Sequence, residues 1–234
     1  MDNAARARQR VLAIFLPIAA VLYISAEALS PKGTDQVVTD SATALKLLAI
    51  AAKHPIQLYV AGTCAVLGLG ALAVSYAAIA ALARNRGAAL ATVAALIGGI
   101  GAFCGAIIEV LVFPNLAAAA ATAHTTRGAA AQFLVTTFNS GFGHGFEYAY
   151  FIGIYVAPLL MGVALWRSRA VPRWLAVLFF AGLEVAQQQI SSGPVVILYM
   201  LPFAAAMVLL AARIWQAAAL PASRPQPEPA SVPA

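Results

Sequence analysis

Long apolar runs constrain this chain more than any other feature. Six segments are almost free of charge and extend for about 20 residues each, enough to cross a hydrocarbon core of about 30 Å as helices. Hydrophobic residues make up 62% of the sequence, charged residues only 9%, and the mean hydropathy is +0.87. A soluble domain needs roughly a quarter charged residues. The sequence therefore predicts an all-α integral membrane protein, multi-pass in the cell membrane. The predicted spans are Val11–Leu29, Pro55–Ala83, Ala88–Phe113, His144–Trp166, Pro172–Gln188 and Pro194–Ile214.

The distribution of basic residues predicts how the six-helix bundle is oriented. With both termini in the cytoplasm, the inside segments hold ten arginines and the outside segments hold four basic residues. Such an excess inside is typical of membrane proteins. The inside residues are Arg6, Arg8, Arg10, Arg84, Arg86, Arg167, Arg169, Arg173, Arg213 and Arg224; those outside are Lys32, Lys46, Lys53 and Arg127.

The segments between the spans differ in length and content. The inner turns are tight, whereas the outer loops are long and suggest short helices lying at the membrane interface. Asp40 or Ser41 can cap one such helix, ALKLLAIAAK, and AAAQFLVTTFNSGFG suggests a second interfacial or re-entrant element. The domain prediction is a basic cytoplasmic head (1–10), a six-span membrane domain (11–216) and a disordered Pro-rich tail (217–234).

Other interpretations of the composition are weaker. The arginine-bearing N-terminus followed by Ala26-Glu27-Ala28 resembles a signal peptide, but its apolar run is long for one. Cys64 and Cys104 lie inside apolar runs with no metal-ligand spacing. The basic residues are scattered beside the spans, where topology accounts for them, so we expect no nucleic-acid partner.

The acidic residues are the most informative group for function. Of eight, two lie in the terminal segments and two in the first outer loop, while all four remaining glutamates lie within predicted spans. Carboxylates in hydrocarbon cost several kcal/mol and normally face a cavity or a partner. At a rise of about 1.5 Å per residue, three lie in the outer third of the membrane and one lies near its middle. The three outer residues are Glu27, Glu109 and Glu147, and the deeper one is Glu184.

Each glutamate has an aromatic residue at helical reach, which predicts a pocket lined by acids and aromatic rings. For Glu27 and Glu109, near span ends, contact with interfacial water is an equally good interpretation, whereas Glu147 and Glu184 favour a buried site. The expected catalytic residues are Glu147, Glu184, Glu109, Glu27 and His144. The expected substrate-binding residues are Tyr23, Phe113, Tyr148, Phe151, Tyr155, Phe180, Gln187 and Gln188.

His144 and the glycines each have a structural interpretation beside a functional one. A lone histidine in a span is more often a hydrogen-bonded structural residue, but next to Glu147 it could relay protons. We expect no metal and no cofactor, because no HxxxH or HExxH spacing occurs. Gly101 with Gly105 and Gly141 with Gly145 form small-xxx-small patterns that predict close helix packing.

The residues support three functional hypotheses. A carboxyl group away from water favours its protonated form and can act as a general acid, and aromatic faces stabilise cations. This combination suits protonation-initiated cyclisation of an isoprenoid substrate that enters the site from the lipid bilayer. The same acids would serve a proton-coupled transporter or exporter, which at this size would need to form an oligomer. They would also serve a non-catalytic membrane subunit that pairs them with another chain.

A resemblance adds to this interpretation. A short basic head, a first span ending in AEALSP, HP before the second span and R-x-R after it resemble the small six-span membrane proteins of high-GC actinobacteria. In kind, the chain is similar to bacterial membrane-bound terpene cyclases, small multi-span proteins with essential intramembrane acids. The resemblance is architectural, so it assigns no residue a role. It implies natural-product biosynthesis by an isomerase of the terpene cyclase type.

Overall fold

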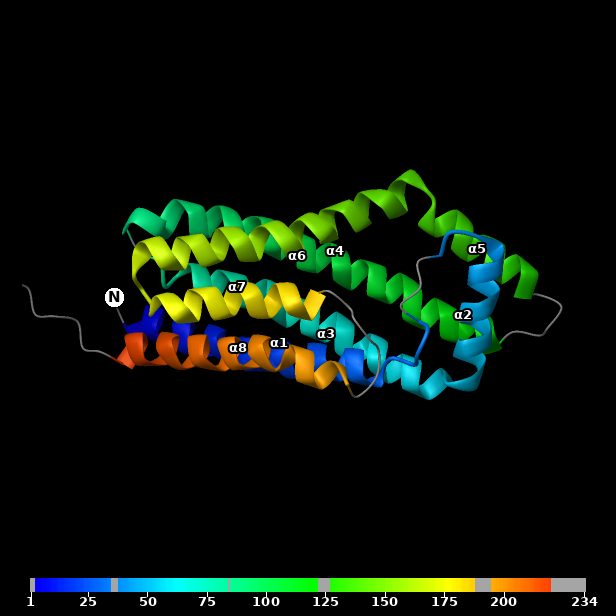
Figure 1. The fold of residues 1–234 in the computed structure, drawn as a ribbon, viewed down its shortest axis with the longest axis horizontal. Helices are drawn as coiled ribbons and strands as arrows, with labels where there is room; N and C mark the ends of the chain where they lie inside the picture. The colour runs from blue at the N-terminus through cyan, green and yellow to red at the C-terminus, as the bar shows by residue number, and fades with distance from the viewer. Residues whose placement is uncertain (1–2, 35–37, 84, 122–126, 188–194, 220–234) are drawn as a thin grey trace, which may run out of the picture.

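The computed structural model describes residues 3–34, 38–83, 85–121, 127–187 and 195–219. These residues form helices throughout and include no strand, as Figure 1 shows. The elements, in chain order, are α1 (Asn3–Leu29), α2 (Ser41–Lys53), α3 (Pro55–Ala80), the 3-10 turn η1 (Asn85–Gly87), α4 (Ala88–Ala121), α5 (Arg127–Phe138), α6 (Gly141–Ser168), α7 (Arg173–Gln187) and α8 (Val196–Ala219).

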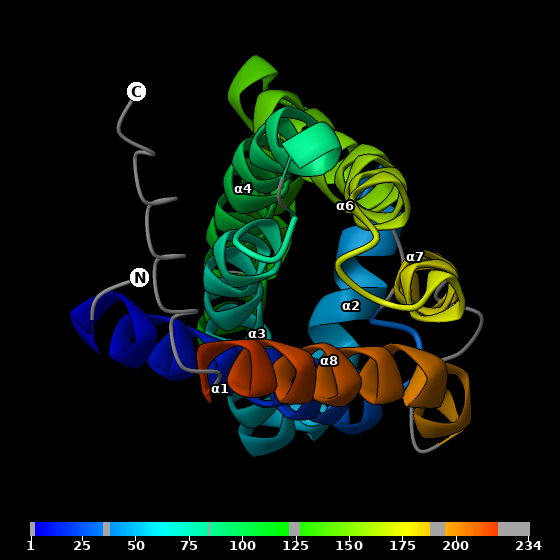
Figure 2. The same ribbon diagram turned by 90° about the vertical axis from the view of Figure 1, so that its left-hand side faces the viewer.

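Six helices form a ring in which each packs against two neighbours. The order around the ring is α1, α3, α4, α6, α7 and α8, and α8 packs back against α1. Figure 2, which looks along the bundle, shows this arrangement. A ring brings one face of every helix toward a shared interior, so residues far apart in sequence can meet there.

Five of these helices are long and apolar enough to cross a membrane, which confirms a helical membrane bundle. They are α1, α3, α4, α6 and α8. The predicted span Pro172–Gln188 corresponds to α7, whose 15 described residues extend only about 22 Å. Helix α7 nevertheless packs in the ring between α6 and α8.

Two helices are longer than the sequence predicts. Helix α1 begins at Asn3, so the basic head forms its first turns instead of a separate segment. Helix α4 continues past Phe113 to Ala121, although a proline at position 114 disfavours a helix interior. The extension is stabilised by burial of Leu116 and Ala120. Most of the predicted tail, residues 220–234, lies outside the described residues.

The two ends of the bundle differ in chemistry. At one end, which we call the basic end, lie the start of α1, the end of α8 and the turns that join α3 to α4 and α6 to α7 (Figure 1). Arg10 lies 5.6 Å from the ring of Trp215, and Arg173 lies 5.1 Å from the ring of Trp166. Tryptophan and arginine side chains of this kind are typical of a membrane interface.

The opposite end carries a small helical cap. Helix α2 runs across the bundle axis and packs against α4 and α5 (Figure 1). This confirms that short helices form in the two long segments between predicted spans. Asp40 caps α2 by accepting a hydrogen bond from the Thr43 backbone N–H at 2.8 Å, and Ser140 caps α6 by accepting one from Gly143 at 3.0 Å.

The apolar residues form two separate cores. The membrane core lies inside the ring and includes Leu72 of α3, Phe179 of α7 and Phe203 of α8. The cap core joins α2, α5 and the extension of α4, with Leu48 and Leu134 among its buried members.

Glycines set the closest helix crossing in the bundle. A Cβ atom on Gly101 of α4 would lie 2.4 Å from the Cα of Gly153 of α6, so only glycine permits this approach. Gly105 similarly makes room for the ring of Tyr150. The prediction of close packing is thus confirmed for Gly101 and Gly105. It is wrong for Gly141 and Gly145, which have open space where a Cβ would be.

Candidate functional site

A layer of carboxyl groups lies between the membrane core and the cap core. On α4, Glu109 lies between Ala102 of the membrane core and Leu116 of the cap core. On α1, Glu27 follows Tyr23, the last buried aromatic residue of that helix. At about 1.5 Å per residue, Glu109 lies about 32 Å from the start of α4 at the basic end. We call Glu27, Glu109 and Glu147 the carboxylate layer.

Two members of this layer meet at a pair of tyrosines. Glu27 and Glu109 are close enough to interact electrostatically, although they come from α1 and α4, which are not neighbours in the ring. The hydroxyl groups of Tyr23 and Tyr150 share a hydrogen bond, and both glutamates act electrostatically on Tyr150. The interior of the ring thus holds two carboxyl groups and two phenols from α1, α4 and α6.

Around this cluster the packing is tight. Tyr23 is buried and makes an edge-to-face contact with Phe203 of α8, with ring centroids 6.4 Å apart. The ring of Tyr150 fits against Gly105 of α4, where a Cβ would come within 2.6 Å of it. Both glutamate side chains keep part of their surface accessible. The cluster therefore combines closely packed aromatic rings with carboxyl groups that are only partly buried.

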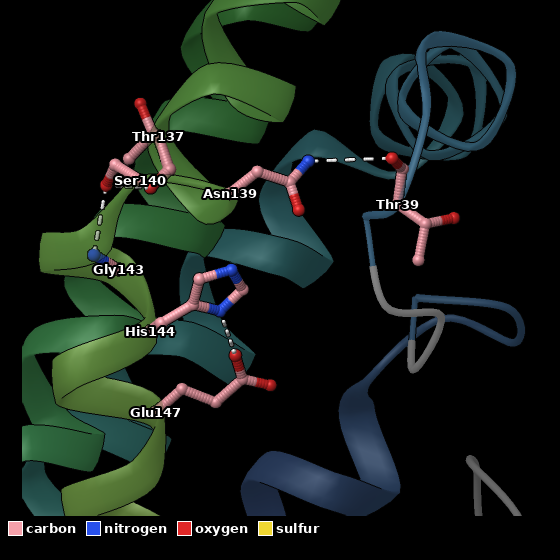
Figure 3. Close-up of polar contacts among 7 residues, drawn as sticks. All are labelled: Thr39, Thr137, Asn139, Ser140, Gly143, His144 and Glu147. Carbon is pink, nitrogen blue, oxygen red and sulfur yellow. Dashed lines mark hydrogen bonds and ion pairs between the residues drawn. The ribbon is translucent and has the colours of Figure 1, made fainter.

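His144 and Glu147 form an ion pair near the start of α6. The Nδ1 atom of His144 lies 3.5 Å from a carboxylate oxygen of Glu147. Figure 3 shows both side chains extending from α6 on the same side as Asn139, whose amide donates a hydrogen bond to the Thr39 carbonyl. The pair is about half exposed. Both side chains are therefore partly accessible from outside the bundle.

The predicted aromatic stripe on α6 is only loosely packed. Tyr148 is 67% exposed, and its ring lies 6.2 Å from that of His144. Phe151 and Tyr155 stack with ring centroids 6.2 Å apart, and both are also exposed. These rings therefore lie outside the buried core, and their role as substrate contacts stays a prediction.

Glu184 lies apart from the carboxylate layer. It is on α7 about 16 Å from the start of that helix at the basic end, near the middle of the bundle. From there it acts electrostatically on Tyr76 of α3, on the far side of the ring. The structure thus brings Glu27 and Glu109 together and leaves Glu184 deeper.

Phe180, one turn from Glu184 on α7, lines a groove on the outside of the bundle. The side chains of Phe113 and Gln187, and the whole of Gln188, lie outside the described part of the chain.

Sequence reasoning missed two residues of the interior, Tyr76 and Tyr150. The Tyr76 hydroxyl is fully buried, and no hydrogen-bond partner is found for it among the described residues. A signal for both was present in α4, where Gly98 and Gly105 are seven residues apart on one face and each makes room for one of these rings. Among the described residues, no three His, Cys, Asp or Glu side chains gather as metal ligands would.

Comparisons with known proteins give no match: no family model, no curated protein and no solved structure is similar to this chain.

Proposed function

We propose that this protein is a membrane-embedded enzyme that performs acid-base chemistry on a lipophilic substrate. The observation that carries the proposal is the electrostatic interaction of Glu27 and Glu109 with each other and with Tyr150, which hydrogen-bonds to Tyr23. Two like charges that lie near each other in apolar surroundings are unfavourable, which favours a pair with one protonated member. One of them can then act as a general acid while the other remains a carboxylate, the arrangement that acid-base catalysis requires.

The reaction class that suits this site best is cyclisation of an isoprenoid chain. The protonated carboxyl group would add its proton to a carbon-carbon double bond and leave a carbocation. The electron pair of a second double bond would then form the new ring bond. Loss of a proton to a carboxylate would give a product isomeric with the substrate, and the aromatic rings would stabilise the cation.

His144 and Glu147 are placed for a supporting role in proton transfer. Their side chains approach each other near the start of α6, at about the depth of Glu109, and both are partly exposed. We propose that this pair exchanges protons between water and the inner carboxyl groups. The apolar interior between Tyr23 and Phe203 would exclude water from the cation.

We also propose the full six-span topology, with α7 as the sixth crossing and both termini in the cytoplasm. The arginines gathered at the basic end support this orientation by the positive-inside rule. The cap and the carboxylate layer would then lie on the outer side of the membrane. A lipophilic substrate would enter the site from the outer leaflet.

A proton-coupled transporter is the second candidate, and the Tyr76–Glu184 pair is the observation that favours it. This pair lies about 15 Å nearer to the basic end than Glu109. Titratable groups at two depths are typical of a proton pathway as well as of an active site. If the protein is a transporter, replacing Glu184 should impair activity as much as replacing Glu109. If it is the proposed enzyme, replacing Glu109 should impair activity more.

The test compares amide variants of the acids in lipid nanodiscs. We expect purified wild type to convert a polyprenyl or prenylated aromatic substrate into an isomer, detected by mass spectrometry. Glu109→Gln and Glu27→Gln keep the shape of the side chain but remove its acid function. Loss of a general acid lowers turnover by about 100-fold or more.

Asp40→Asn is the matched control, because it makes the same acid-to-amide change in the cap, away from the carboxylate layer. Its turnover should equal that of wild type. If the folded wild type isomerises none of these substrates, or if Glu109→Gln turns over at the wild-type rate, the enzyme proposal is wrong. Proton-coupled uptake by proteoliposomes that is lost in Glu184→Gln would instead establish the transporter.

A further inference from the structure

A groove of about 310 Å³ lies between α6 and α7, in the half of the bundle nearest the basic end. Its lining is wholly apolar, and several of its residues are exposed, so it opens to the outside of the ring. Gly162 leaves no room for a side chain next to Phe180, where a Cβ would lie 3.1 Å away. The walls are formed by Leu159, Val163 and Trp166 of α6 and by Ala176, Val177 and Phe180 of α7.

The end of this groove is strongly basic. Trp166 lines the groove, and the Arg173 guanidinium lies 5.1 Å from its ring. Arg167 lies in the last turn of α6 and Arg169 directly follows that helix, and both are exposed. The positive end of the α7 dipole lies here as well, because α7 begins at Arg173.

An apolar slot that ends beside Arg173, with two further exposed arginines nearby in the chain, matches one class of ligand. Between Trp166 and Leu159 the groove follows α6 for about 10 Å, which lies within the half-thickness of the hydrocarbon core. An acyl chain would fill the slot, and a phosphate headgroup would meet the arginines. Basic pockets between membrane helices bind anionic lipid headgroups in this way.

We propose that this groove binds one anionic phospholipid of the leaflet at the basic end, with an acyl chain between α6 and α7 and its phosphate at Arg173. The inference is independent of the proposed function, since the carboxylate layer lies near the opposite end. The lipid would fill the space that α6 and α7 leave between them and so fix the position of α7 in the ring.

Native mass spectrometry of the full chain with added phosphatidylglycerol or phosphatidylcholine tests the proposal. We expect one phosphatidylglycerol to remain bound to wild type, with phosphatidylcholine held more weakly. Arg173→Gln should weaken the binding of phosphatidylglycerol about fivefold, which is the effect of removing one surface charge. Arg8→Gln, an exposed arginine of α1 at the same end, is the charge control and should bind like wild type.

A second pair of variants tests the slot itself. Val177→Trp fills the groove from an exposed position, while Val93→Trp makes the same change on the exposed face of α4. We expect Val177→Trp to lose the bound lipid and Val93→Trp to keep it. Equal retention of the two lipids by wild type, or wild-type binding by both Arg173→Gln and Val177→Trp, would overturn the proposal.

Discussion

The tyrosine side chains of Tyr76 and Tyr150 lie in different surroundings within the bundle. Both rings lie against glycines of α4, but the Tyr150 hydroxyl shares a hydrogen bond with Tyr23, whereas the buried Tyr76 hydroxyl has no partner among the described residues. A buried polar group without a partner costs free energy, while a satisfied one contributes a little. The two residues should therefore respond in opposite directions to the same substitution.

We expect Tyr76→Phe to raise the free energy of unfolding by about 1–3 kcal/mol, since it removes an unsatisfied hydroxyl. Tyr150→Phe should lower it by about 0.5–1.5 kcal/mol through loss of the hydrogen bond to Tyr23. Thermal or denaturant unfolding in detergent measures both. A clear loss of stability in Tyr76→Phe would show that its hydroxyl binds a group in the folded protein, with Glu184 the nearest acid that acts on it.

At the scale of elements, the α4–α6 crossing depends on two backbones in direct contact. A methyl group on Gly101 would overlap the Cα of Gly153, so the helices would have to separate. Separation would also displace Tyr150, which α6 holds against Gly105. The position of one side of the carboxylate layer therefore depends on this crossing.

Gly101→Ala should lower the free energy of unfolding by about 1–3 kcal/mol, the cost typical of overpacking. Gly99→Ala on the same helix is the matched control, because a Cβ there meets open space. Alanine also favours a helix over glycine, so the control should be unchanged or more stable. Equal effects of the two substitutions would contradict the close crossing. Thermal unfolding monitored by circular dichroism distinguishes these outcomes.

The cap helix α2 should depend on pH through Asp40. The hydrogen bond from the Thr43 backbone N–H holds the pKa of this carboxyl below its ordinary value of 3.8. Because the folded-state pKa lies below the unfolded value, the cap stabilises α2 at neutral pH. This contribution is lost as the pH falls through the folded pKa.

Hydrogen exchange of the α2 amides measures this effect. In wild type, we expect protection of the first turn, relative to the intrinsic exchange rate, to fall below about pH 4. Asp40→Ala should show weak protection at every pH. Asp40→Asn should keep the cap and lose the pH dependence, since asparagine is an equally good N-cap without a charge. A pH response that persists in Asp40→Asn would assign the titration to another group.

At the scale of the whole molecule, the structure separates an arginine-rich end from a capped end. If the basic end faces the cytoplasm, a cysteine placed in the cap should react with a membrane-impermeant maleimide in intact cells. We expect this for Thr39→Cys, and labelling of Ala170→Cys only after permeabilisation, with Cys64 and Cys104 replaced by alanine. The reverse pattern would invert the topology. Labelling of both sites in intact cells would contradict the bundle as a spanning unit.

The sequence alone determined the helical membrane class, the cap helices and the clustering of arginines at one end. These depend on local patterns, because length, apolarity and capping residues act within a single helix. The presence of acids inside the spans was equally plain from Glu27, Glu109 and Glu184. The sequence did not show which of these acids interact with each other. Partners across a ring depend on the order and rotation of the helices, which local sequence patterns do not encode.

Only the tertiary structure decided that Glu27 interacts electrostatically with Glu109, whereas Glu184 acts electrostatically on Tyr76. It also decided how far α4 extends, because burial of Leu116 and Ala120 in the cap core outweighs a local helix-breaking residue. The glycines of α4 show the same division. Their spacing predicted close approach, but only the packed helices determined that Gly101 meets a backbone while Gly98 and Gly105 accommodate the two tyrosines. Close packing depends on how two helix surfaces fit together. The residue pattern of one helix does not contain that information.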